Sequence, residues 1–153
     1  MTATTLEERI LRLEDLEAIR DLTARYADAI NKGWNGKTVD ADAIRHIFAA
    51  DARWEGFDGA VTQGADAIAA ELTKATSVVQ LSMHTFLNPV ITVDGDTAAG
   101  KWLMWVGSVI ADNPRSVYMS ADMTYTRTDE GWRIQTVLIG FGTMVRGSDG
   151  GTA

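Results

Sequence analysis

The hydrophobic residues of this chain change their spacing near residue 84. Before this point they recur at intervals of three and four, and the longest series is Ile10, Leu13, Leu16, Ile19, Leu22, Tyr26 and Ile30. After it, apolar runs are separated by turn signals at residues 94–96, 112–115 and 129–131. The first pattern is typical of amphipathic helices and the second of strands. Helices followed by consecutive antiparallel strands indicate an α+β fold.

Caps and turns set the expected bounds of the elements. Thr5 and Glu8 have the spacing of a capping box, which predicts a first helix that continues to Ile30 and ends before Gly33. A second helix has its buried face at Ala43, Ile44, Ile47 and Phe48 and closes at Asp51, and a third covers residues 64–75. The expected strands are a short one at 53–57 and long ones that begin at 84, 97, 117 and 132.

Four long strands cannot bury both faces against three helices unless the sheet curls. We therefore expect a cone-like, curled antiparallel or mixed sheet that encloses a pocket together with about three N-terminal helices. The convex face keeps a second apolar surface, which another subunit normally covers, so a homodimer or homotrimer is expected. All 153 residues fit one domain, with flexible ends at 1–8 and 147–153.

Charge and composition exclude several classes of protein. The formal charge is −7 and no basic block is present, which argues against nucleic-acid binding. The chain has no cysteine and two distant histidines, so no metal site is expected, and no phosphate-binding glycine motif occurs, so no cofactor is expected. Neither a targeting segment nor an apolar run long enough to span a bilayer is seen, which favours a cytoplasmic protein without membrane contact.

His84 is the strongest single candidate for chemistry, since it is a titratable group among apolar neighbours. In the central hairpin Trp102 and Met104 alternate with Leu103 and Trp105, and the sequence does not decide which set faces inward. Tryptophan and methionine around a concave site favour a small apolar or aromatic ligand. The residues expected to contact it are Trp54, Phe57, Trp102, Met104, Met119, Asp122 and Phe141.

Two charged residues within strands have two interpretations each. Asp122 either faces the pocket with a raised pKa or pairs with Arg53 or Arg133. Lys101 either extends its amine to solvent from the strand or acts as a desolvated base.

Four motifs occur in an order that resembles the SnoaL-like branch of the nuclear-transport-factor-2-like superfamily. The resemblance covers about Leu13 to Phe141. The motifs are Ala18-Ile19-Arg20-Asp21-Leu22 followed by Tyr26, Phe48-Ala49-Ala50-Asp51-Ala52-Arg53-Trp54, His84 followed by Asn88-Pro89 and Asp94-Gly95-Asp96-Thr97-Ala98, and the run from Tyr125 to Ile134.

The resemblance implies a cone-shaped fold and a dimer or trimer. Members include a hexachlorocyclohexane dehydrochlorinase, scytalone dehydratase and small polyketide cyclases, several of which use no cofactor. They pair a strand histidine, which takes a carbon-bound proton, with an aspartate near the end of the first helix. His84 matches the histidine, but Asn31 stands in the aspartate's place. An amide holds one imidazole tautomer without stabilising the imidazolium.

We therefore expect a cofactor-independent lyase or isomerase that acts on a small, apolar, aromatic molecule by elimination, dehydration or retro-aldol cleavage. His84 is the expected general acid/base, with Asn31 and Tyr26 orienting the substrate or stabilising an oxyanion. Asp28 is an alternative polar partner on the same helix face. The alternative functions are a non-catalytic binding or scaffold protein and the small subunit of a ring-hydroxylating oxygenase.

Overall fold

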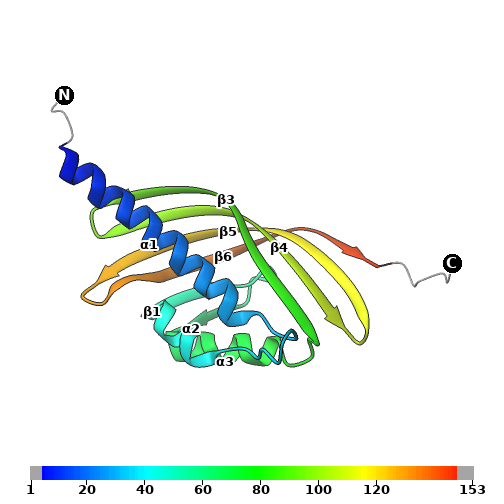
Figure 1. Ribbon diagram of the computed structural model, residues 1–153. Coiled ribbons are helices and arrows are strands. Elements are labelled where there is room, and N and C mark those ends of the chain that lie inside the picture. Colours follow the sequence, from blue (N-terminus) through cyan, green and yellow to red (C-terminus); the bar gives the residue numbers. More distant parts are fainter. Residues whose placement is uncertain (1–4, 148–153) are drawn as a thin grey trace.

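The structure is a computed structural model that describes residues 5–147 and contains three helices and one six-stranded sheet (Figure 1). The sheet order is β2-β1-β6-β5-β4-β3, in which only β1 and β6 are parallel neighbours. The sheet is curled and not closed, which confirms the expected α+β fold with a mixed sheet. The elements are α1 (Leu6–Ile30), α2 (Ala41–Ile47), β1 (Phe48–Glu55), β2 (Val61–Gln63), α3 (Ala65–Ala75), β3 (Leu81–Asp94), β4 (Thr97–Ile110), β5 (Asn113–Thr128) and β6 (Gly131–Arg146).

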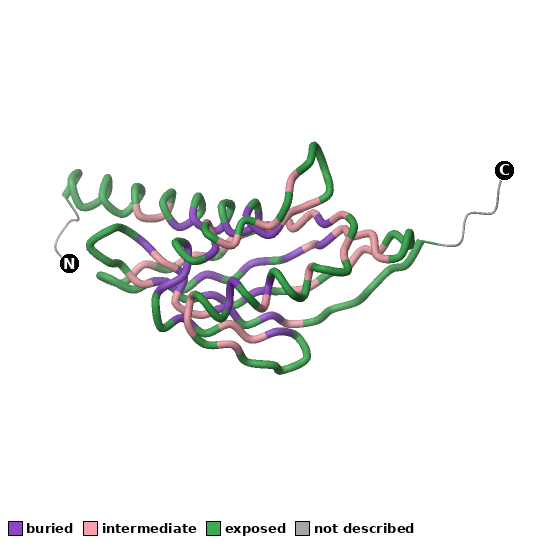
Figure 2. Tube along the Cα trace, turned by 90° about the horizontal axis from the view of Figure 1, so that it is seen from below, coloured by how far each residue is buried: buried purple, intermediate pink, exposed green. Residues whose placement is uncertain are grey.

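Helix α1 begins with the expected capping box. The backbone N–H of Thr5 donates to Glu8 Oε2 over 2.7 Å, and the backbone N–H of Glu8 donates to Thr5 Oγ1 over 3.1 Å. The expected apolar stripe is buried only from Ile19 onward, whereas Ile10 and Leu13 are exposed (Figure 2). Residues 5–8, which we expected to be flexible, belong to this capped start. The other expected flexible residues, 1–4 and 148–153, lie outside the described range.

The second helix ends earlier than the sequence predicts. α2 stops at Ile47, and Phe48 is already the first residue of β1, with no loop between them. The prediction that the helix continues to Asp51 is therefore wrong. The apolar residues at positions 47, 48, 49 and 52 are buried, and their spacing suits a helix as much as a strand. The hydrophobic period therefore did not show where α2 ends and β1 begins.

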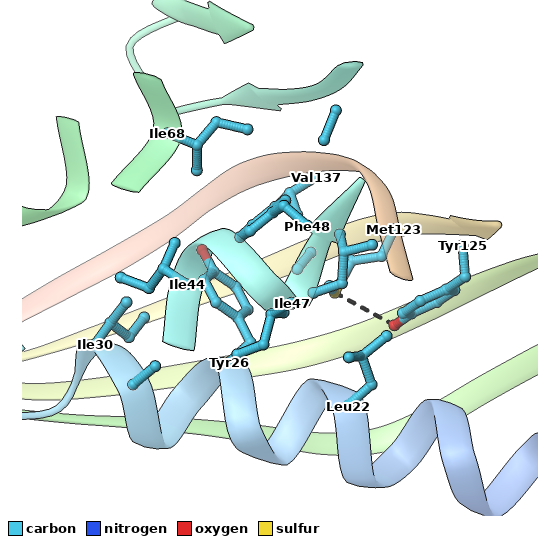
Figure 3. Close-up of a cluster of buried hydrophobic side chains, with 14 of the residues drawn as sticks. Leu22, Tyr26, Ile30, Ile44, Ile47, Phe48, Ile68, Met123, Tyr125 and Val137 are labelled. Atoms are coloured by element: carbon cyan, nitrogen blue, oxygen red, sulfur yellow. Dashed lines mark hydrogen bonds between the residues drawn. The ribbon is translucent and has the colours of Figure 1, made fainter. Parts of the chain in front are cut away.

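The long hairpins of β3 to β6 position the site. The turn between β4 and β5 lies at Ala111-Asp112, where φ is 50° and 61°, instead of the expected 112–115. Trp102 and Met104 are buried on the concave face, under the helices, while Leu103 is exposed on the convex face. The core gathers side chains from all three helices and the sheet (Figure 3). Within residues 5–147 no helix is long and apolar enough to cross a membrane.

Candidate functional site

The end of α1 is fastened to the start of β3. Lys32 and Ser82 form a β-bridge in which each backbone N–H donates to the other's carbonyl, over 3.3 and 3.0 Å. Asn31 directly precedes this bridge as the C-cap of α1, with an extended backbone (φ −74°, ψ 145°). The side chain of Asn31 is thereby brought against His84, two residues along β3 from Ser82.

One oxygen of Asn31 accepts two hydrogen bonds from His84. The backbone N–H of His84 donates to Asn31 Oδ1 over 2.7 Å, and His84 Nδ1 lies 3.0 Å from the same atom. Because the backbone N–H can only donate, it orients the amide with its oxygen toward His84. Since this oxygen can only accept, Nδ1 must carry the proton and Nε2 must carry the lone pair.

His84 is therefore a neutral imidazole with an available nitrogen. Burial lowers the pKa of His84 from its ordinary 6.5 to about 4. Nε2 has no hydrogen-bond partner within residues 5–147, and His84 lines a cavity. The site can accept a proton or a hydrogen bond at Nε2, but within residues 5–147 no carboxylate is hydrogen-bonded to His84 to stabilise the resulting cation.

A cavity of about 300 Å³ lies beside His84, between α1 and β3. Asn31, His84, Phe86 and Trp102 line one side of it, and the lining residues from α1 are Arg20, Thr23, Ala24, Ala27 and Asp28. The carboxylate of Asp28 is held by Lys37 Nζ over 2.9 Å, so it is paired and not free to serve His84. A cavity of this volume, at the lower end for small-molecule sites, has room for a compact ligand.

A larger, more open groove of about 1000 Å³ lies elsewhere, along α2, α3 and β6, and does not include His84. Its basic side chains are already neutralised, since Arg45 pairs with Asp42 and Asp66, and Arg133 pairs with Glu130. We therefore take the cavity at His84 as the candidate site.

Tyr26 and Trp54, expected near the pocket, are joined to each other in the core. Trp54 Nε1 donates to the Tyr26 hydroxyl over 3.1 Å, and the Tyr26 ring packs edge-on against Phe48 at 5.3 Å between centroids. Burial raises the pKa of Tyr26 above its ordinary value. Tyr26 does not line the cavity at His84, although its ring lies 5.7 Å from that of Phe86, which does.

Met104, Met119 and Phe141 occupy paired positions on neighbouring strands of the concave face, in one row with Phe86. Phe141 is 51% exposed, and it packs against Phe57, which is 63% exposed in the loop after β1, at 5.7 Å between ring centroids. These two rings lie at the open end of the concave face and not in the cavity beside His84.

Asp122 does not face the pocket. Its neighbours Ala121 and Met123 are buried on the concave side, so Asp122 points to the convex face, where it pairs in register with Lys101. The expected pairing with an arginine is also absent from residues 5–147, because Arg53 and Arg133 bind Glu55 and Glu130 instead. Alternation along β5 places Asp122 on the same face as Ser120 and Thr124, opposite the apolar residues Met119, Ala121 and Met123, so this signal was present in the sequence and was not used.

Sequence reasoning missed a buried polar network behind the cavity. Trp102 Nε1 donates to the Tyr125 hydroxyl over 3.0 Å, and the hydroxyls of Tyr125 and Thr23 are 2.9 Å apart. Thr23 donates to the carbonyl of Ile19, and the Tyr125 hydroxyl also lies 3.5 Å from Met123 Sδ, to which it can donate (Figure 3). Burial raises the pKa of Tyr125 to about 12. Because Thr23 and Trp102 both line the cavity, this network fixes its inner wall.

A model of the SnoaL-like domain family matches residues 11–137, more than half of the chain. The protein therefore belongs to the SnoaL-like domain family. No match is found among curated proteins.

Solved structures share the fold. An NTF2-like protein with a cystatin-like fold from Novosphingobium aromaticivorans is 26% identical, with 92% of each chain covered and a TM-score of 0.76. A hexachlorocyclohexane dehydrochlorinase is 16% identical, with 93% of this chain and 95% of that chain covered and a TM-score of 0.78. A candidate scytalone dehydratase from the same Novosphingobium species is 14% identical, with 88% of each chain covered and a TM-score of 0.76.

Proposed function

We propose that this protein is a cofactor-independent lyase or isomerase in which His84 Nε2 removes a carbon-bound proton from a small, mostly apolar, aromatic substrate. The observation that carries the proposal is the pair of hydrogen bonds from His84 to Asn31 Oδ1, which leaves Nε2 unprotonated beside a cavity. A general base needs both properties, an available lone pair and access to the substrate.

The low basicity of His84 restricts the reaction. With a pKa of about 4, Nε2 is a weak base that stays unprotonated at neutral pH. The substrate must therefore carry an activated proton, either next to a carbonyl group or opposite a good leaving group. The electron pair of the broken C–H bond then forms an enolate or expels halide or hydroxide, and hydroxide takes the proton from His84 Nε2 and leaves as water, while Asn31 keeps Nδ1 protonated throughout.

The family relationship supports this class of reaction in general terms. Structural neighbours are named as a dehydrochlorinase and a candidate scytalone dehydratase, and both names describe eliminations. Phe86 and Trp102 supply aromatic walls to the cavity at His84, which suits a flat apolar substrate. Tyr26 contributes by supporting Phe86 from behind, since its own hydroxyl is held in the core by Trp54.

The alternative is a non-catalytic small-molecule-binding protein of the same fold. Asn31 favours it, because an amide cannot neutralise an imidazolium. In serine proteases the change from aspartate to asparagine beside the catalytic histidine lowers the rate by about four orders of magnitude. Under this alternative His84 Nε2 accepts a hydrogen bond from a ligand hydroxyl and no proton is transferred.

Proton exchange separates the two functions. The wild type should accelerate hydrogen–deuterium exchange at the activated carbon of aromatic ketones such as 2-tetralone in D2O, followed by proton NMR. His84→Gln should abolish the acceleration, and His46→Gln, which removes the exposed second histidine, should leave it unchanged. Binding of the ketones without accelerated exchange in the wild type would support the binding protein and contradict the lyase.

We also propose that a second copy of the chain covers the convex face of the sheet. Leu103 is 54% exposed there, Tyr118 is 49% exposed and Leu138 is 44% exposed. An apolar surface of this kind on a protein that is not membrane-bound is normally covered in an oligomer. Leu103→Lys should lower the mass measured by light scattering to that of a monomer, and an unchanged mass would contradict the proposal.

A further inference from the structure

The strand pairing arranges the concave face into three parallel rows of side chains near His84. One row is apolar and consists of Phe86, Met104, Met119 and Phe141. The next begins with His84 and continues through Val106, Val117 and Met144. The outermost row is polar and ends in two arginines: Ser82, Ser108, Arg115 and Arg146. Alternation places all three rows on the same face as buried Trp102 and Ala121.

Arg115 and Arg146 lie directly opposite one another on β5 and β6. Like charges in paired positions of a sheet destabilise it. Neither arginine forms an ion pair with any carboxylate in residues 5–147. Asp112, in the turn just before β5, is engaged by Gln80 through two hydrogen bonds. Within residues 5–147, therefore, no carboxylate is paired with either of these two arginines.

Arg115 also has a buried donor without a partner. Its Nε is buried and makes no hydrogen bond within residues 5–147, which is a costly state for a charged group. The other basic groups near the helices are paired, for example Arg45, Arg53, Arg127 and Arg133. An anion between Arg115 and Arg146 would relieve the repulsion between the two guanidinium groups.

We propose that Arg115 and Arg146 bind the carboxylate of an aromatic substrate whose apolar body lies across Val117 and Val106 toward His84. The proposal rests on the proposed function and names its substrate class. A guanidinium offers two parallel donors that match a carboxylate, and neither Arg115 nor Arg146 has a carboxylate partner within residues 5–147.

The distance between the arginines and His84 allows one small molecule to contact both. Arg115 is two strands and two residues away from His84 in the paired register, which corresponds to roughly 12 Å between their Cα atoms. The arginine side chain covers part of this distance. A one- or two-ring molecule with its carboxylate at the arginines therefore brings a ring substituent to His84.

A matched pair of ligands tests the proposal, namely 2-naphthoate and its neutral analogue 2-naphthamide, measured by isothermal titration calorimetry. The wild type should bind the carboxylate more tightly than the amide. Arg115→Gln and Arg146→Gln should each weaken naphthoate binding by about tenfold or more and leave naphthamide unchanged, as expected for loss of a charged hydrogen bond. Arg9→Gln, which removes the same charge at the exposed start of α1, should change neither.

The readouts distinguish this proposal from the proposed function. Equal affinities for naphthoate and naphthamide in the wild type, or equal losses for both ligands in the Arg115 and Arg146 variants, would overturn the anion site. The wild type and His84→Gln could both fail to accelerate proton exchange while Arg115→Gln still weakens the binding of naphthoate and not of naphthamide. This result would contradict the proposed lyase activity and support the anion site. Arg146→Gln provides a second test on an exposed side chain should Arg115→Gln fail to fold.

Discussion

Replacing Asn31 by aspartate changes the charge beside His84 while keeping the geometry. A carboxylate oxygen can accept both hydrogen bonds that Oδ1 now accepts, from the backbone N–H and from Nδ1, over 2.7 and 3.0 Å. The wild-type pKa of His84 is about 4 because burial disfavours the imidazolium. An opposite charge at this distance raises a histidine pKa by about 1–3 units, or roughly 1.4–4 kcal/mol. We therefore expect Asn31→Asp to move the pKa of His84 to about 5–7.

Titration of the imidazole carbon signals by NMR measures this change directly. The chain has two histidines, so His46→Gln identifies the signal of His84. Asn35→Asp, in the exposed loop after α1, adds the same charge away from the site and should leave the pKa of His84 near 4. A wild-type His84 that titrates at its ordinary 6.5, or one that Asn31→Asp does not shift, would refute the reasoning from burial and hydrogen bonding.

Three further predictions concern stability. The pKa of His84 is lower in the folded than in the unfolded chain, so the free energy of unfolding should fall by about 3 kcal/mol as the pH is lowered from 6.5 to 4. In urea titrations, His84→Gln should make the free energy of unfolding less dependent on pH over this range. Tyr125→Phe should cost about 1–3 kcal/mol because two buried groups lose their partner, whereas exposed Tyr118→Phe should cost little. Gly100→Ala places a Cβ 2.9 Å from Trp102 Nε1 and should cost about 1–3 kcal/mol in thermal unfolding.

Local patterns predicted much of the fold. The capping box at Thr5 and Glu8 marks the start of α1, and Asp94-Gly95-Asp96 marks the first hairpin. The boundary at Phe48 was missed because a short apolar run suits either a helix or a strand. Ile10 and Leu13 fit the helix period but are exposed, and the helical period alone does not indicate which apolar residues of a helix are buried.

The candidate site was predictable where one family motif identifies one residue. His84 and Asn31 were expected together, and the structure joins them by two hydrogen bonds. The hydrogen bond between Thr23 and Tyr125 joins residues that are 102 positions apart, so the spacing of residues along the chain could not predict it. The face of Asp122 was predictable from the alternation along β5, where Asp122 shares a face with Ser120 and Thr124 and not with the apolar residues.

Asn31 Oδ1 accepts two hydrogen bonds, and this limits which residues can replace Asn31 in related chains. A single atom both fastens the backbone of β3 to α1 and selects the imidazole tautomer, so a side chain without a suitably placed oxygen would lose both effects at once. Asparagine and aspartate alone keep the shape of this contact, and they differ by one nitrogen. Related chains can thus alternate between a neutral and an ionic partner for the histidine with no rearrangement of the scaffold around it.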